Sequence, residues 1–174
     1  FPAKPLAKIN GKELILHVLE KCNEISDKKK IIVATDSVKI VNFVNRNNYN
    51  SILTSTKCLT GTDRVSEVSN KINAKIYVNV QGDEPLINPK DIKKIILAKK
   101  KFKTHVICGV TKISKNENPK STSIPKVVFN KNLDMIYMSR SIIPGNKIKR
   151  KPKKLHYWKQ VCIYAFTKRD LKIF

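Results

Sequence analysis

The 174-residue chain has few of the residues that mark a disulfide scaffold, a zinc site or a membrane span. Its four cysteines include no Cys-x-x-Cys pair, and its three histidines lie at no zinc-ligand spacing from them. No apolar run approaches the roughly 20 residues that cross a bilayer. The start of the sequence shows no basic segment leading into an apolar one, as a secretory signal would. Cysteines in apolar segments fit a reducing compartment, so we predict a cytoplasmic protein. The lack of an apolar span predicts that it has no membrane partner.

Acidic residues are also scarce. The chain has 36 Lys and Arg against 13 Asp and Glu, a formal net charge of +23 at pH 7. Such an excess is typical of nucleic-acid binders, whose affinity comes largely from phosphate contacts. Here the excess is almost all lysine and is spread along every segment, with denser clusters at 99–101 and 147–154. A nucleic-acid partner is therefore the minor alternative, and small anionic ligands are the partners that this charge favours.

What the sequence does contain is an alternation of helix-like and strand-like segments, which predicts an α/β protein with a parallel sheet. Apolar residues at helical spacing predict helices at 11–25, 38–46 and 61–72. Asn88-Pro89-x-Asp91 opens a further helix, because it combines a cap, a first-turn proline and an acid at the positive end. Continuous apolar runs predict strands at 31–36, 76–80 and 105–113.

The rhythm changes in the last third of the chain. Two strand-like runs flank Lys131-Asn132, which is a hairpin signal. A basic, proline-containing loop is expected at 145–156, followed by a last strand at 159–166. We treat 1–174 as one domain, and 125–166 as its hairpin and loop region.

Two of the predicted strands end in acids, at Thr35-Asp36 and at Gly82-Asp83-Glu84. In open α/β sheets, ligands bind beyond the carboxyl ends of the strands. Gly82 allows close approach of the backbone to a ligand, and Asp83 offers the hard oxygen that Mg²⁺ prefers alongside substrate phosphates. A solvated turn is the alternative reading of two adjacent acids.

Five motifs in order give the chain a resemblance to a known family. They are F-P-A-K-P-L-A-K-I-N-G-K at 1–12, I-I-V-A-T-D at 31–36, T-G-T-D-R-V-S-E at 60–67, V-N-V-Q-G-D-E-P at 78–85 and Y-M-S-R-S-I-I-P at 137–144. The ordered set resembles the 3-deoxy-manno-octulosonate (KDO) cytidylyltransferases, or CMP-KDO synthetases, over nearly the whole length. The fourth motif is the most specific signature of that family.

The resemblance implies a Rossmann-like nucleotidyltransferase fold, a three-layer sandwich with a mostly parallel sheet and a β-hairpin excursion. It implies transfer of CMP from CTP to KDO with release of pyrophosphate, for lipopolysaccharide biosynthesis. The cofactor would be Mg²⁺. The protein would be a homodimer formed through its later strands, and the region at 125–166 would serve sugar binding and dimerisation.

The resemblance also assigns residues. Lys4 and Asp83 would carry catalysis, Lys4 by holding the triphosphate and Asp83 by binding the metal. Nucleotide contacts would further come from Thr60, Gly61 and Arg64. Sugar contacts would come from Gln81, Arg140, Gln160 and Tyr164. Arg140 would grip the KDO carboxylate through its planar fork. The alternative is a helix-surface charge for Arg64 and a surface ion pair for Arg140. For Gln81 it is a turn-stabilising amide, and for Tyr164 a buried strand aromatic.

The chain departs from the family pattern in two places. Lys57-Cys58 stands where the family usually has Asp-His, and Gln160 with Cys162 stands where it has His-x-Gly. These changes leave open a different acid sugar, either a sialic-type sugar or an amino-octulosonate. We also expect the family's first strand and Arg-bearing phosphate loop before Phe1, and a second metal-binding Asp beyond Phe174. Residues 1–174 alone are therefore expected to catalyse poorly.

Overall fold

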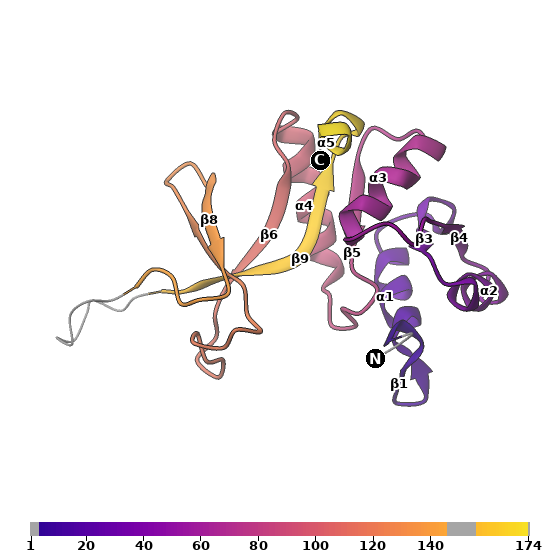
Figure 1. Cartoon of the computed structure of the whole chain (residues 1–174), viewed down its shortest axis with the longest axis horizontal. Helices are drawn as coiled ribbons and strands as arrows, with labels where there is room; N and C mark the ends of the chain where they lie inside the picture. Colours follow the sequence, from indigo (N-terminus) through magenta and orange to yellow (C-terminus); the bar gives the residue numbers. More distant parts are fainter. Residues whose placement is uncertain (1–3, 146–155, 174) are drawn as a thin grey trace. The chain divides into compact units, whose positions relative to one another are not determined.

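The computed structural model describes residues 4–145 and 156–173 (Figure 1). The predicted basic loop at 145–156, with its lysine cluster at 147–154, lies almost wholly outside the described residues. The chain divides into two compact units, one formed by 1–107 with 162–174 and the other by 108–161. The single domain and the role of 125–166 stay predictions, and each unit is described by itself.

The first unit contains most of the helices. Its elements are η1 (Lys4–Leu6), β1 (Lys8–Ile9), β2 (Lys12–Glu13), α1 (Leu14–Asn23), η2 (Lys28–Lys30), β3 (Ile32–Thr35), α2 (Val38–Arg46), β4 (Asn50–Leu53), α3 (Gly61–Lys71), β5 (Tyr77–Val80), α4 (Pro89–Lys101) and α5 (Lys168–Ile173). The second unit holds most of β6 (Ile107–Lys112), together with β7 (Lys126–Phe129) and β8 (Met135–Ser139). Strand β9 (Trp158–Phe166) contributes its first residues to the second unit and its last residues to the first.

The predicted helices and strands are confirmed, but strand β4 was not predicted, and the first helix begins later than expected. The helix predicted from residue 11 begins at Leu14, because β1 and β2 form a short antiparallel hairpin before it. Asn10 and Gly11 turn this hairpin with φ angles of 51° and 78°. Asn-Gly is the favoured pair where both turn residues need positive φ, so the sequence carried a signal for the hairpin.

The strand pairings are mixed. β3 and β4 are parallel, in register from Ile32 opposite Asn50 to Thr35 opposite Leu53. β9 runs antiparallel to β5 in the first unit, and β7 runs antiparallel to both β8 and β9 in the second. Helix α2 connects the parallel strands β3 and β4. The predicted hairpin β7–β8 is confirmed. Strand β9 is antiparallel to β5, as is common in mixed sheets.

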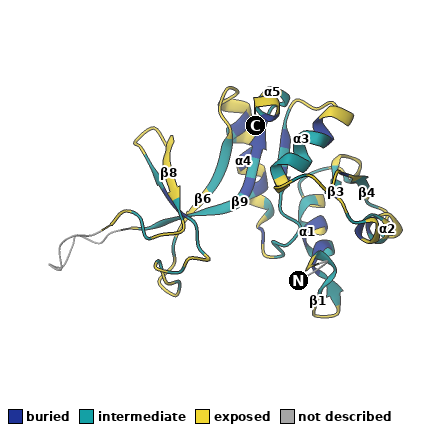
Figure 2. Cartoon of the chain, viewed as in Figure 1, coloured by how far each residue is buried: buried dark blue, intermediate teal, exposed yellow. Residues whose placement is uncertain are grey.

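Two apolar clusters stabilise the first unit. One joins α1 to α2 through the buried side chains Ile15, Leu19, Ile40 and Val44. The other packs Tyr77 of β5 against Phe166 of β9 and Leu171 of α5. Val65 of α3 packs against the second cluster, which therefore joins β5 to α3, α5 and β9. By contrast, β8 is exposed along almost its whole length (Figure 2).

Candidate functional site

The signature motif at 78–85 places Asp83 just after the carboxyl end of β5, where it pairs with Lys4. The Lys4 ammonium donates to Asp83 Oδ2 at 2.5 Å, although the two residues are 79 positions apart in sequence. Their side chains are 56% and 32% exposed, so both can be reached by a ligand. The hydrogen bond to Asp83 and its negative charge raise the pKa of Lys4, which keeps this ammonium charged. The structure thus brings together the two residues predicted to carry catalysis.

The turn that carries Asp83, at 81–84, packs closely against helix α1. A Cβ on Gly82 would lie 3.8 Å from Ile15 Cδ1, so the Gly82 backbone rests on α1. The Gln81 carbonyl accepts the amide of Glu84 at 3.3 Å, which closes the turn that carries Asp83. Gln81 therefore lies beside the charged pair, at the tip of β5.

The predicted nucleotide residues Thr60 and Gly61 form the start of α3. Thr60 Oγ1 accepts the amide of Asp63, and the Asp63 carboxylate accepts the amide of Thr60, a reciprocal capping box. In the part of the chain that the structure describes, no acceptor is bound to the first-turn amides of Gly61 and Thr62. A helix start with free amides suits a negatively polarised ligand atom.

The Arg64 guanidinium is hydrogen-bonded to residues that follow the two parallel strands β3 and β4. Its Nη2 donates to Asp36 Oδ2 at 2.8 Å, just after β3, while its Nη1 donates to Thr54 Oγ1 at 2.8 Å and to the Ser55 carbonyl at 3.2 Å, just after β4. The guanidinium has five N–H donors, so two remain for a ligand. The predicted alternative of a free surface charge is wrong for Arg64.

Three residues of this site were not predicted as site residues. Asp36 and Thr54 anchor Arg64, and Asn79 of β5 lies beside α3, with its Nδ2 3.6 Å from the position of a Cβ on Gly61. Asn79 is 8% exposed and stands in an otherwise apolar strand. A buried amide in such a run is a sequence signal, because burying a polar group is costly without a local purpose.

Tyr164 and the remaining sugar candidates are placed differently. Tyr164 of β9 stacks on Phe166 with ring centroids 6.2 Å apart and packs against the Tyr77 cluster, as the strand-aromatic alternative predicts. Arg140 and Gln160 belong to the second unit. There the Arg140 Nη1 donates to the Thr122 carbonyl at 2.8 Å, and Gln160 Nε2 contacts Cys108 Sγ at 3.6 Å. The roles of Arg140 and Gln160 in sugar binding stay predictions.

The carboxylates at 83–84 are the oxygen donors that could bind a divalent metal ion here. No group of three or more His, Cys, Asp or Glu side chains that could hold a metal occurs within the described residues. Asp83 has Glu84 as its neighbour in the same turn. Mg²⁺ often binds through one or two carboxylates, with substrate phosphates and water completing its shell. The residues present therefore fit Mg²⁺ that arrives with a triphosphate, and do not fit an all-protein metal cage.

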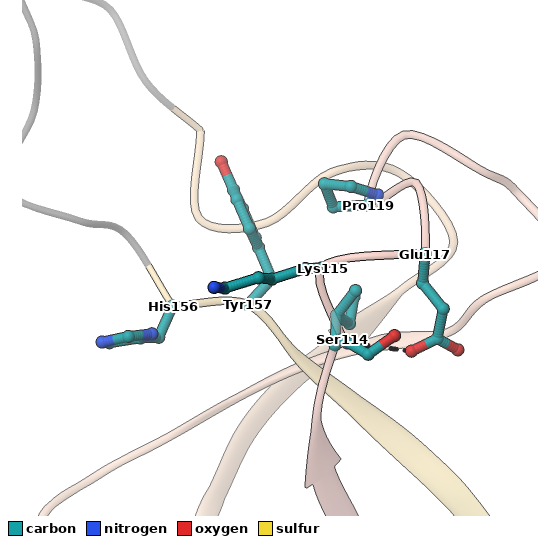
Figure 3. Close-up of a pocket in the computed structure, with 7 residues that line it drawn as sticks. Ser114, Lys115, Glu117, Pro119, His156 and Tyr157 are labelled. Carbon is teal, nitrogen blue, oxygen red and sulfur yellow. Dashed lines mark hydrogen bonds between the residues drawn. The ribbon is translucent and has the colours of Figure 1, made fainter.

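A separate cavity of about 260 Å³ lies in the second unit, between the loop at 113–119 and the residues before β9 (Figure 3). Ser114, Lys115, Glu117 and Tyr157 are among the residues that line it. Glu117 accepts the amide of Ser114 and a hydrogen bond from Lys159, and these bonds lower its pKa to about 2. None of the predicted site residues lines this cavity.

The α/β fold and the comparisons with known proteins define a nucleotidyltransferase. The chain is similar to a solved CMP:2-keto-3-deoxy-manno-octonic acid synthetase complexed with CTP, with a TM-score of 0.87 and 36% identity over 99% of this chain and 70% of that one. This likeness confirms the predicted α/β nucleotidyltransferase fold.

Curated relatives agree. The 3-deoxy-manno-octulosonate cytidylyltransferase of Escherichia coli is 35% identical over 98% of this chain and 68% of its own length. The 8-amino-3,8-dideoxy-manno-octulosonate cytidylyltransferase of Shewanella oneidensis is 33% identical over 100% of this chain and 72% of its own length. The cytidylyltransferase family matches residues 1–174. The chain therefore belongs to the cytidylyltransferase family, as its motifs predicted.

Proposed function

We propose that this protein transfers CMP from CTP to KDO and releases pyrophosphate, in lipopolysaccharide biosynthesis. The observation that carries the proposal is the 2.5 Å pairing of Lys4 with Asp83 at the end of the family's signature strand. Of the relatives compared, the E. coli protein is named for this sugar, and the similar solved structure is described as complexed with CTP. Both likenesses extend over nearly all of this chain.

Charge neutralisation and positioning supply the catalysis in phosphoryl transfer of this kind. In the ligand-free chain Lys4 and Asp83 neutralise each other. An incoming triphosphate offers Lys4 a second, more highly charged partner, and leaves an Asp83 oxygen open. Mg²⁺ bound at Asp83 would supply neutralisation between phosphate and sugar oxygens. The start of α3, at Thr60 and Gly61, then orients the nucleoside half through its free amides.

The sugar acid is proposed to bind the residues that the family resemblance assigns to sugar contacts. Arg140 Nη1 donates to backbone carbonyls of its own unit. Among the residues that the structure describes, Nη2 and Nε bind no acceptor, and this edge of the guanidinium can bind a carboxylate through two parallel hydrogen bonds. Gln81 at the tip of β5 would bind sugar hydroxyls, and the resemblance assigns further sugar contacts to Gln160 and Tyr164.

The test is pyrophosphate release from CTP and Mg²⁺ with KDO, its 8-amino analogue or a sialic acid as acceptor. It uses the chain extended at both ends, because residues 1–174 alone are expected to catalyse poorly. We expect turnover with KDO and a loss of about a hundredfold or more in Asp83→Asn, because charge stabilisation at a transferring phosphoryl group supplies several kcal/mol. The matched control is Asp91→Asn, a carboxylate in the first turn of α4, which should keep its rate. Equal rates for both variants would refute the role of Asp83.

The identity of the acceptor is the second outcome of the same assay. Identities of 35% and 33% do not separate the KDO relatives from the amino-octulosonate relatives. Faster turnover with the 8-amino sugar than with KDO would replace KDO as the substrate and leave nucleotidyl transfer intact.

The protein is further proposed to work as a cytoplasmic homodimer. The support is the exposed strand β8, where Met135, Ile136 and Tyr137 are 54%, 65% and 62% exposed. Contiguous exposed apolar side chains of this kind mark association surfaces. Among the helices that the structure describes, none is long and apolar enough to cross a membrane. Light scattering after size exclusion tests the dimer, and a monomer at micromolar concentration would contradict it.

A further inference from the structure

The lysine cluster at 99–101 divides between two sides of α4. Lys99 is 1% exposed, and its ammonium donates to Asp170 Oδ2 at 2.6 Å and to the carbonyls of Lys103 and His105. Lys100 and Lys101, the next two residues, are exposed. One lysine of the cluster is therefore part of the interior, and the other two belong to a surface.

That surface is a regular face of the helix. With 3.6 residues per turn, its lysines and Leu97 fall within an arc of roughly 120°, opposite the buried Ile92 and Ile95. The exposed lysines on this arc are Lys90, Lys93, Lys94, Lys100 and Lys101. Within the residues that the structure describes, only Lys94 of these five forms an ion pair, with Asp91 at 2.9 Å. We refer to these five lysines with Leu97 as the α4 basic face, and Phe102, seven residues after Ile95, lies beside this face at the end of the helix.

Large apolar side chains are also exposed on and beside the α4 basic face. Leu97 lies among the lysines and is 54% exposed, and Phe102, the C-cap of the helix, is 46% exposed. The Lys101 ammonium lies 5.3 Å from the centre of the Phe102 ring, so charge and apolar surface are adjacent. Val106, a few residues further, is 52% exposed. Lysines with an exposed apolar side chain among them offer a membrane surface both attraction to its headgroups and apolar contact.

We propose that the α4 basic face docks reversibly on an anionic phospholipid surface. The lysines complement the headgroup charge, while Leu97 enters the boundary between headgroups and acyl chains. A nucleic acid would pair with the lysines but would leave Leu97 against a charged backbone, so the apolar centre favours lipid. Surface docking needs no membrane span, and this proposal departs from the expectation of no membrane partner, which rested on the missing span. The proposal is independent of nucleotidyl transfer.

The expected strength follows from the charge count. Each lysine close to an anionic leaflet strengthens binding by about fivefold. Removing four of them should therefore weaken binding by a hundredfold or more, and added salt should weaken it in the intact protein because the Debye length shortens.

The test is co-sedimentation of the protein with vesicles of phosphatidylglycerol and phosphatidylcholine, compared with phosphatidylcholine alone. The variant K93Q/K94Q/K100Q/K101Q keeps good helix formers on the surface. Its matched control removes the same charge at exposed lysines elsewhere. The control substitutions are K39Q, K75Q, K120Q and K131Q. We expect the α4 variant to lose binding about a hundredfold and the control to change it only a fewfold. Equal loss in both would show that net charge alone drives adsorption, and would overturn the proposal.

A second variant separates lipid from nucleic acid. L97Q/F102Q keeps every charge, and we expect it to weaken vesicle binding while binding to duplex DNA stays as in the parent protein. Vesicle binding that is unchanged in L97Q/F102Q, with DNA binding lost in the lysine variant, would point to nucleic acid and contradict lipid docking. Both variants should keep their circular dichroism spectrum and their rate of pyrophosphate release in solution, so failure here differs from failure of the proposed catalytic function.

Discussion

Arg64→Lys tests whether one side chain anchors the strand ends and also binds the nucleotide. The guanidinium joins Asp36 after β3 to Thr54 and Ser55 after β4. A lysine ammonium is a point donor and can reach one side of this arrangement but not both. The variant therefore keeps a positive charge and loses the bridge between the two strands.

The magnitude follows from the exposure of each partner. A hydrogen bond to a charged group contributes about 1.5–3 kcal/mol when it is well buried. The Asp36 side chain is 37% exposed, which reduces its share to about 0–1 kcal/mol. Thr54 is only 5% exposed, so its lost bond costs close to the full amount for a neutral acceptor, about 1 kcal/mol. Arg64→Lys should lower the free energy of unfolding by about 1–2 kcal/mol.

Two measurements together decide the interpretation. Urea unfolding followed by circular dichroism gives the stability change, and calorimetric titration with CTP and Mg²⁺ gives the affinity. We expect CTP to bind about tenfold more weakly to Arg64→Lys, because two directed N–H donors are replaced. Thr54→Val is the control, since it loosens the anchor and keeps the guanidinium. Unchanged stability in Arg64→Lys would refute the anchoring argument, and unchanged CTP affinity would refute the nucleotide role.

Three further substitutions probe the site and its support. Gly61→Ala should change the free energy of unfolding by less than about 1 kcal/mol, because its Cβ meets the nearest atom at an ordinary 3.6 Å, yet it should weaken CTP binding in the same titration. Lys99→Met leaves the largely buried Asp170 carboxylate without its cation and should cost about 3–5 kcal/mol in urea unfolding, with a smaller loss when combined with Asp170→Asn. Glu117→Gln should cost about 0.5–1 kcal/mol at neutral pH, because the pair with Lys159 is only partly buried. The folded-state pKa of Glu117, about 2, lies below its ordinary value of 4.5, so this stabilisation is present above about pH 4.5 and fades toward pH 2; a constant difference in unfolding free energy across that range would contradict it.

The helices were predictable because their signals are local. The predicted range 38–46 coincides with α2, and Asn88 caps α4 through its side chain as expected. Strand β4 was missed because Asn50-Ser51-Ile52-Leu53 is short and half polar, and only its pairing with β3 makes it a strand. The antiparallel course of β9 was missed for a similar reason, since strand direction in a sheet is a long-range property that no single segment encodes.

The candidate site divides in the same way. Asp83 was identified by its place at a strand end, and the structure adds that Lys4 is its partner. The anchoring of Arg64 could not be read from the sequence, because Asp36 is 28 positions away and nothing local links the two. Strand-end position predicts where ligands bind, but the internal partners of a charged side chain depend on which strand ends become neighbours.

The lysines show where sequence periodicity helps and where it fails. Lys99 is spaced from Ile92 and Ile95 as i+7 and i+4, which places it on the buried stripe of α4, so its separation from Lys100 and Lys101 was available from helical geometry. Lys126 offers no such signal. It opens β7 before Val127, both residues are buried, and its ammonium donates to the carbonyls of Ser121 and Ile124 in a preceding turn. A strand with neighbouring residues buried on both faces has no alternation to read, so only the fold shows that this cation serves backbone carbonyls and not a ligand.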